Sequence, residues 1–290
     1  AATGGNNADL PEMCRKGDQE VPTAEIIKTS TILIAMPQFS ATAPLFPHAK
    51  APGKLRVGSM PGVAKFMEES GLSADYTKIG EKCKKLEAIF NQAIAAEVEF
   101  STGHLCYFDL PLENKALVDD GLLHPERAGT PDGLSNLPAG EVFCVPNENP
   151  DSRTHGELPQ RFGDDTVVYV VRNNRIVDVK GDGPEVEILR EKFIADQGWQ
   201  NIAEFAIGVN DKARVTGIVL EDEKAGFHWA YGRSDHFGGQ CGVDKFNSPS
   251  NVIHQDVVYA KESPISCKKL DIIYPDDTRQ TLIIDGTLQV

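Results

Sequence analysis

Residues 202–210 form an apolar segment that carries one carboxylate, Glu204, near its start. Its β-branched and other apolar residues predict a buried strand. An ionised carboxylate inside such a strand is unfavourable unless it is paired with a positive charge or bound to a metal ion. Whatever fold the chain adopts must therefore bring a suitable partner to Glu204.

The segment 227–258 offers such partners, because it contains His228, His236 and His254, three of the seven histidines. His254 and Asp256 form an H-x-D pair ahead of an apolar run. In a strand, residues i and i+2 point to the same face, so this pair predicts half of a divalent metal site. A structural or surface role for the pair is the alternative, and His228 fits equally well as a core histidine.

Glu141 follows a Leu-Pro-Ala-Gly turn and stands where another strand is expected to begin. Its carboxylate either accepts hydrogen bonds from backbone amides or is a further metal ligand. Three carboxylates and two imidazoles can hold two divalent ions with one carboxylate bridging, and the candidates are Glu141, Glu204, His228, His254 and Asp256. Ligands without thiolate favour Zn, Co or Mn. Two such ions about 3.5–4 Å apart would activate a water and stabilise the oxyanion of a hydrolysed carbonyl.

The spacing of apolar residues predicts an α/β fold. Strands are expected at 29–35 and 55–59, a Pro-rich loop between them, and an amphipathic helix over 76–97. The second half is rich in strands, with a hairpin at Asn173-Asn174. We expect an N-terminal α/β domain with a parallel sheet at 1–108, lacking a first βα unit. A strand-rich mixed α+β domain with the metal site is expected to follow at 109–290.

Composition excludes several classes of protein. The net charge of −14 argues against a nucleic-acid backbone or an anionic membrane as partner. The six cysteines include no C-x-x-C pair, which argues against a zinc ribbon or a thioredoxin motif and indicates reduced thiols. No apolar run approaches the length of a membrane span, and the start does not resemble a signal peptide. A cytoplasmic location is expected.

Five blocks of sequence, taken in order, resemble the metallo-aminopeptidases of the aminopeptidase T/aminopeptidase S type. The blocks are Asn-Leu-Pro-Ala-Gly-Glu141-Val-Phe, Ala-Glu204-Phe-Ala-Ile-Gly-Val-Asn210, Leu-Glu-Asp-Glu-Lys224, His228-Trp-Ala-Tyr-Gly and His254-x-Asp256. The resemblance covers most of the chain from about Thr29 onward, and the chain would be a short-form member.

The resemblance implies an activity and a set of roles. The five candidate residues would hold two metal ions, with Glu204 bridging and Glu141 also moving the proton of the attacking water. The substrate would be a peptide or another small molecule, and cleavage would release its N-terminal residue. Family members are typically homodimers, so a homodimer or a higher homo-oligomer is expected. From the residue types alone, we interpret residues 221–224, which are all charged, as a solvated turn.

One departure from the family keeps other functions open. The family's catalytic Tyr is replaced by Asp235, and the neighbouring His236 becomes the candidate catalytic donor. A related branch resembles dioxygenases that cleave a dihydroxypyridine ring with a single Fe(II). His228, His254 and Asp256 match the two-His-one-carboxylate pattern of such iron enzymes. A non-catalytic relative that only binds metal is the third possibility.

Overall fold

The computed structural model describes residues 9–290, and the chain divides into two compact units. Unit 1 comprises the chain up to Cys83 together with Val118–Glu141 and Asn210–Lys224. Unit 2 comprises Lys84–Leu117, Val142–Val209 and Ala225–Val290. Along the chain, α3 (Tyr76–Phe90), β7 (Leu117–Asp119) and β9 (Glu141–Cys144) pass from one unit into the other.

Unit 1 is an α/β layer around a short parallel sheet. Its sheet has the order β3-β4-β8, formed by Ile32–Ala35, Arg56–Ser59 and Leu134–Asn136, with both pairings parallel. Its other elements are the β1–β2 hairpin (Met13–Lys16 and Gln19–Pro22), α1 (Thr23–Thr29), α2 (Thr42–Lys50) and α5 (Val219–Asp222). Helices α1 and α2 bury Ile27, Leu45 and Ala49 beside Val57 of β4, which gives the parallel strands the covered face that they require.

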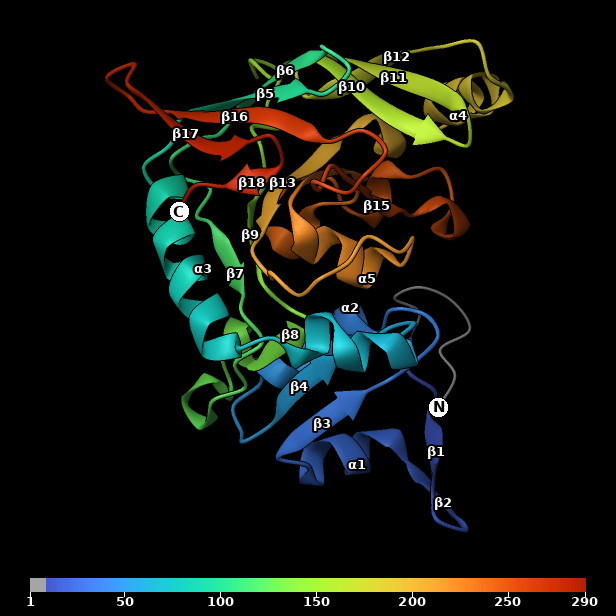
Figure 1. Cartoon of the computed structure of the whole chain (residues 1–290). Coiled ribbons are helices and arrows are strands. Elements are labelled where there is room, and N and C mark those ends of the chain that lie inside the picture. Colours follow the sequence, from blue (N-terminus) through green and yellow to red (C-terminus); the bar gives the residue numbers. More distant parts are fainter. Residues whose placement is uncertain (1–8) are drawn as a thin grey trace. The chain divides into compact units, whose positions relative to one another are not determined.

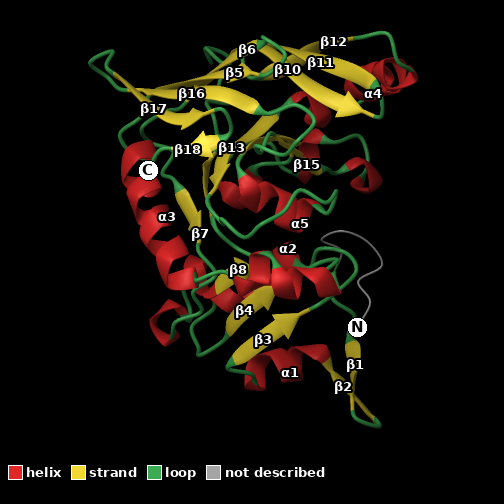
Figure 2. Cartoon of the chain, viewed as in Figure 1, coloured by secondary structure: helices red, strands yellow, loops and turns green. Residues whose placement is uncertain are grey.

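Unit 2 is dominated by strands, as Figure 2 shows. Its largest sheet is antiparallel, with the order β12-β11-β10-β6-β5-β16-β17-β18. These strands are, in chain order, β5 (Ala95–Phe100), β6 (Leu105–Asp109), β10 (His155–Phe162), β11 (Asp165–Arg172), β12 (Arg175–Lys180), β16 (Cys267–Ile273), β17 (Arg279–Ile284) and β18 (Thr287–Leu288). Helix α4 (Pro184–Ala195) contacts β12.

A second sheet of unit 2 packs against the first through aromatic side chains. Its strands in this unit follow the order β15-β14-β13-β9, with β13 at Ile202–Gly208, β14 at Phe227–Gly232 and β15 at His254–Val258 (Figure 1). Phe227 of β14 contacts Phe100 and Phe108 of the large sheet and also Phe205 and Tyr259. This aromatic cluster fixes the position of β13 and β14, the strands that carry Glu204 and His228.

The α/β fold class is confirmed, with a parallel sheet early in the chain and a strand-rich part that carries the histidines. The domain boundary expected after residue 108 stays a prediction. The hairpin at Asn173-Asn174 is confirmed, since these residues adopt φ of 50° and 61°. Among the described residues, no helix is both long and apolar enough to cross a membrane.

Two local predictions were wrong. The Pro-rich segment contains α2, with Pro44 in the first turn, where proline is tolerated, and Pro47 inside the helix. The burial of Leu45 and Ala49 on one face outweighs the cost of the internal proline. The long helix ends at Phe90 rather than at residue 97, since 95–100 form β5 between β6 and β16. Hydrogen bonds to two neighbouring strands outweigh the helical spacing of the apolar residues there.

Phe227 tests the aromatic cluster, because its side chain is fully buried. Replacing Phe227 by Ala should lower the free energy of unfolding by about 3–5 kcal/mol, through lost burial and the cavity that is left. Urea denaturation measures the change. The control is Phe66→Ala, at a side chain that is 38% exposed and should lose much less. Equal losses in the two variants would contradict the cluster's role.

Candidate functional site

Four of the five predicted ligands lie on three neighbouring antiparallel strands of unit 2. Glu204 of β13 is opposite Ala230 of β14, and Ala230 is opposite Asp256 of β15. His228 and His254 each lie two residues from one of these positions along their own strands. Opposed residues and residues two apart project from the same face of a sheet. The structure therefore brings these four side chains to one face.

Glu204 stands between the two imidazoles. Its side chain is 4% exposed, and its Oε2 lies 2.9 Å from Nε2 of His254. Its other oxygen, Oε1, lies 3.8 Å from Nε2 of His228. Asp256 completes the group, with Oδ1 3.7 Å from Nε2 of His254. The partner that the sequence requires for the buried carboxylate is thus imidazole nitrogen on both sides.

Two backbone features shape the strands around this group, a bulge in β13 and a glycine at the end of β14. A register shift in β13 between Ile202 and Glu204 inserts one extra residue, and such bulges re-aim the side chains that follow them. Gly232 has a φ of +109°, and a Cβ there would collide with the carbonyl oxygen of Ile253. Glycine is therefore required at this end of β14, where the strand passes close to the backbone of Ile253.

Both imidazoles are oriented by the backbone. The Nδ1–H of His254 donates to the carbonyl of Arg233 at 2.7 Å, and that of His228 donates to the carbonyl of Gly226 at 3.2 Å. Each ring therefore turns Nε2 toward Glu204. Metal-binding histidines are oriented in this manner, with one nitrogen fixed by a carbonyl and the other directed toward the ion.

The charges of the group fit a cation. Burial raises the pKa of Glu204. Burial alone would lower the pKa of His254, but the hydrogen bonds to Asp256 and Glu204 raise it well above its usual value. Ligand atoms of Glu204, His254 and Asp256 all lie within 4.8 Å of one another. Two carboxylates and one imidazole nitrogen at this spacing form a suitable donor set for a divalent ion.

His236, the predicted catalytic donor, lies beside this group. It belongs to a short 3-10 turn, η7 (Asp235–Phe237), and its ring centroid is 5.3 Å from that of His254. Burial and the charge of His254 lower the pKa of His236 to about 3, which keeps the ring neutral. Asp235, the residue before His236, forms an ion pair with Arg233 at 2.5 Å.

Glu141, the fifth predicted ligand, is the last residue of the second stretch of unit 1 and the first residue of β9. Within unit 1, its Oε1 lies 2.5 Å from Nζ of Lys224, which also contacts Glu223 and lies 4.0 Å from Asp119. The Lys224 side chain is fully buried. Burial alone would lower its pKa, but the three carboxylates raise it well above the usual value.

The interpretation of residues 221–224 as a solvated turn was therefore wrong. All four of these charged side chains are buried, because each finds a partner: Glu221 accepts the backbone N–H of Gly71 at 2.7 Å, and Asp222 accepts those of Thr216 and Gly217. In a single sequence, four consecutive charged residues predict a solvent-exposed segment. The resemblance of this block to a known family was the only sequence feature that pointed to another role.

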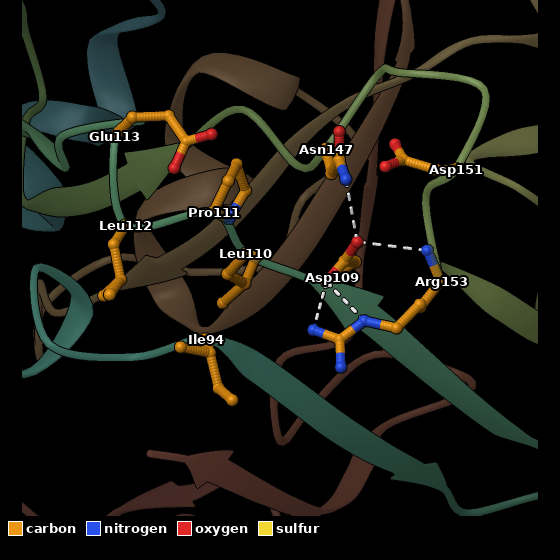
Figure 3. Close-up of a pocket in the computed structure, with 9 residues that line it drawn as sticks. All are labelled: Ile94, Asp109, Leu110, Pro111, Leu112, Glu113, Asn147, Asp151 and Arg153. Carbon is orange, nitrogen blue, oxygen red and sulfur yellow. Dashed lines mark hydrogen bonds and ion pairs between the residues drawn. The ribbon is translucent and has the colours of Figure 1, made fainter. Parts of the chain in front are cut away.

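A separate hollow of about 390 Å³ lies on unit 2 (Figure 3). At its edge, the buried carboxylate of Asp109 accepts hydrogen bonds from Asn147 at 2.9 Å and from the Arg153 guanidinium at 2.6 and 3.1 Å. Its remaining lining is Ile94, Leu110, Pro111, Leu112, Glu113 and Asp151. This ion pair ties β6 to the segment after β9.

Neither protein-family models nor curated protein sequences match the chain. Solved structures do. Wild-type AmpT from Thermus thermophilus has a TM-score of 0.59 and 17% identity, over 86% of this chain and 68% of AmpT. The 2,5-dihydroxypyridine dioxygenase from Pseudomonas putida KT2440 has a TM-score of 0.61 and 16% identity, over 91% and 73% of the two chains. At these identities, the likeness establishes a shared fold.

Lys224 offers a test of the buried ion cluster of unit 1. Replacing it by Met should lower the free energy of unfolding by about 3–5 kcal/mol, because buried carboxylates lose their counter-charge. Chemical denaturation measures the loss. The matched control is Lys212→Met at an exposed lysine of the same unit, which should change stability by less than about 0.5 kcal/mol. A neutral result for Lys224 would contradict the cluster.

Asp109 gives a pH prediction. Burial alone would raise its pKa, but bonds from Arg153 and Asn147 lower it below the usual 3.8. The pKa of Asp in an unfolded chain is about 3.9. The stabilisation that the Asp109 carboxylate contributes is therefore fully present above this pH. It is lost as the pH falls through the lower pKa that Asp109 has in the folded protein. Between pH 5 and 2, Asp109→Asn should therefore lose less stability than the wild type. The control is Asp151→Asn, at an exposed site, which should lose as much stability over this pH range as the wild type does.

Proposed function

We propose that the chain is a metal-dependent hydrolase of the aminopeptidase type, which removes N-terminal residues from peptides. The observation that supports this most is the position of Glu204 between two imidazoles. Its Oε2 faces His254 and its Oε1 faces His228, so each oxygen is directed to a different nitrogen. A carboxylate held in this manner suits a bridge between two cations, and two-cation sites are typical of aminopeptidases.

In this proposal, the donor set would hold two divalent ions, Zn, Co or Mn. His254 and Asp256 would hold one ion and His228 the other, with Glu204 shared between them. The resemblance adds Glu141 as the fifth ligand. When bound, the ions would lower the pKa of a water and polarise the scissile carbonyl. The fold neighbour AmpT is consistent with this activity at the level of fold.

The protein's own groups would then move protons and stabilise charge. Glu141 takes the proton of the attacking water and passes it to the leaving amine, as general base and then general acid. His236, neutral and beside His254, supplies a hydrogen-bond donor to the developing oxyanion in place of the missing Tyr. The proposed setting is a cytoplasmic homodimer or higher homo-oligomer that acts on peptides or other small molecules.

A second candidate is a ring-cleaving dioxygenase with one Fe(II). Two observations favour it. His228, His254 and Asp256 project from one face of the sheet, as two imidazoles and one carboxylate. Asp235 is engaged with Arg233 and offers no phenol for peptide hydrolysis. The neighbouring dioxygenase fold is consistent with this class. A non-catalytic metal-binding relative is the remaining alternative.

Metal content of anaerobically purified protein separates these functions. The hydrolase should hold two equivalents of Zn, Co or Mn per chain and cleave peptides with a free N-terminal amine. In Glu204→Gln, which keeps the shape but removes the bridging charge, we expect one equivalent or less and a loss of hydrolysis of about 100-fold or more. Elemental analysis and a peptide panel measure both effects.

The control for this substitution is Glu191→Gln, at an exposed carboxylate of α4. It should keep both metal equivalents and full turnover. One equivalent of iron, oxygen uptake on a dihydroxylated pyridine and retention of iron in Glu204→Gln would replace the hydrolase by the dioxygenase. Bound metal without turnover on either substrate class would favour the non-catalytic relative.

A further inference from the structure

Residues 234–241, here called the His236 loop, leave the sheet after β14 and return to nearly the same point. Hydrogen bonds between its two ends close the loop at its neck. The N–H of Ser234 donates to the carbonyl of Cys241 at 2.9 Å, and the N–H of Gly239 donates to the carbonyl of Ser234 at 3.0 Å. The N–H of Cys241 donates to Oγ of Ser234 at 3.1 Å. Ser234 therefore organises both ends of the loop.

A carboxylate from elsewhere in unit 2 binds this neck. Oε1 of Glu148 accepts hydrogen bonds from Oγ of Ser234 and from Nδ2 of Asn201, both at 2.5 Å. Its other oxygen, Oε2, accepts the backbone N–H of Gln240. The fit around the carboxylate is close, because a Cβ at Gly239 would lie 2.8 Å from Oε2 of Glu148 and would collide with Ser234. One side chain thus connects the two ends of the loop to the start of β13.

The segment that carries Glu148 is itself fixed. Asn147 donates its backbone N–H to the carbonyl of Asp109 at 2.8 Å and its side-chain amide to the Asp109 carboxylate at 2.9 Å. On the other side, the carbonyl of Asn149 accepts the N–H of Ser152 at 2.9 Å, and the carbonyl of Pro150 accepts the side-chain amide of Asn173 at 3.1 Å. Glu148 is therefore held in place from both sides, and a rigid acceptor can define where the loop lies.

The tip of the loop is the part that contacts the candidate metal site. The ring centroids of His236 and Phe237 each lie 5.3 Å from that of His254. Phe237 also packs edge-on against Phe143 of β9, with centroids 4.8 Å apart. A shift of the neck would move both rings relative to His254, since only a few residues separate neck from tip.

We propose that Glu148 is a positioning residue of the site: by binding Ser234 and the Gln240 amide, it holds the His236 loop so that His236 and Phe237 lie against His254. Glu148 accepts hydrogen bonds from Ser234, Asn201 and Gln240, and these three residues are not candidate ligands. Its effect on turnover rests on the proposed function, whereas its effect on the loop does not. The two can therefore fail separately.

Amide hydrogen exchange and aromatic NMR of metal-loaded protein test the proposal. In Glu148→Ala, the Gln240 amide should exchange at least about tenfold faster, since its acceptor is gone, while amides of β13 and β14 keep their protection. The ring resonances of His236 and Phe237 should shift. If the chain is a hydrolase, kcat should fall by about 10–100-fold with the metal equivalents unchanged, because misplacing a catalytic group has effects of this size.

Glu148→Gln is the conservative variant, because its amide oxygen can still accept the hydrogen bonds from Ser234 and Asn201 that Oε1 accepts in the wild type. Its ring resonances should change less than those of Glu148→Ala, whereas the Gln240 amide still loses its acceptor. Glu148→Gln also replaces Glu148→Ala in every measurement if the alanine variant does not fold. The matched control is Asp151→Ala, at an exposed carboxylate three residues along, which should leave loop exchange and ring resonances as in the wild type.

Unchanged ring resonances in Glu148→Ala would overturn the proposal, even if the Gln240 amide exchanged faster. Loss of bound metal with normal loop exchange would also overturn it, because Glu148 would then act on the ligands and not through the loop. Absence of peptide hydrolysis in the wild type would count against the proposed function alone. The loop measurements would keep their meaning in that case.

Discussion

The interaction on which this structure depends is the pairing of a buried carboxylate with imidazole nitrogen at the centre of a sheet. Glu204 lies in a strand whose other side chains are buried, and it is stable there because His254 and His228 face its two oxygens. The bulge before Glu204 re-aims the side chains that follow it, and Gly232 lets β14 pass close to the backbone of Ile253. The aromatic cluster around Phe227 holds the same strands from behind.

Local patterns predicted the parts of the fold that obey local rules. The β-branched strands, the Asn173-Asn174 hairpin and the H-x-D pair follow from alternation and turn preference, so they were visible in the sequence. The end of α3 was not, because residues 95–100 form a strand only in the presence of β6 and β16. Helix α2 was hidden for a similar reason, since its prolines obscured a face that is buried by tertiary contacts.

The candidate site also has features that the sequence predicted and features that it did not. The pattern of one carboxylate in an apolar strand predicted that Glu204 would need a partner, and the antiparallel register of β13, β14 and β15 supplied it. The burial of Lys224 and the role of Glu148 were not predictable. Each depends on acceptors or donors from distant segments, such as Glu141 for Lys224 and Gln240 for Glu148. A single sequence contains no record of such pairings.

The division of each unit into three stretches has a consequence for synthesis on the ribosome. Unit 1 includes Asn210–Lys224, so its buried ion cluster cannot form until residue 224 has been translated. In unit 2, β5 can pair with β6 early, but its other edge stays unpaired until β16 has been translated, because Ala95 pairs with Ile273. Until then, the apolar strand edges of the first half stay unpaired, and such nascent chains are prone to aggregation. This architecture therefore favours shielding of the emerging chain by chaperones.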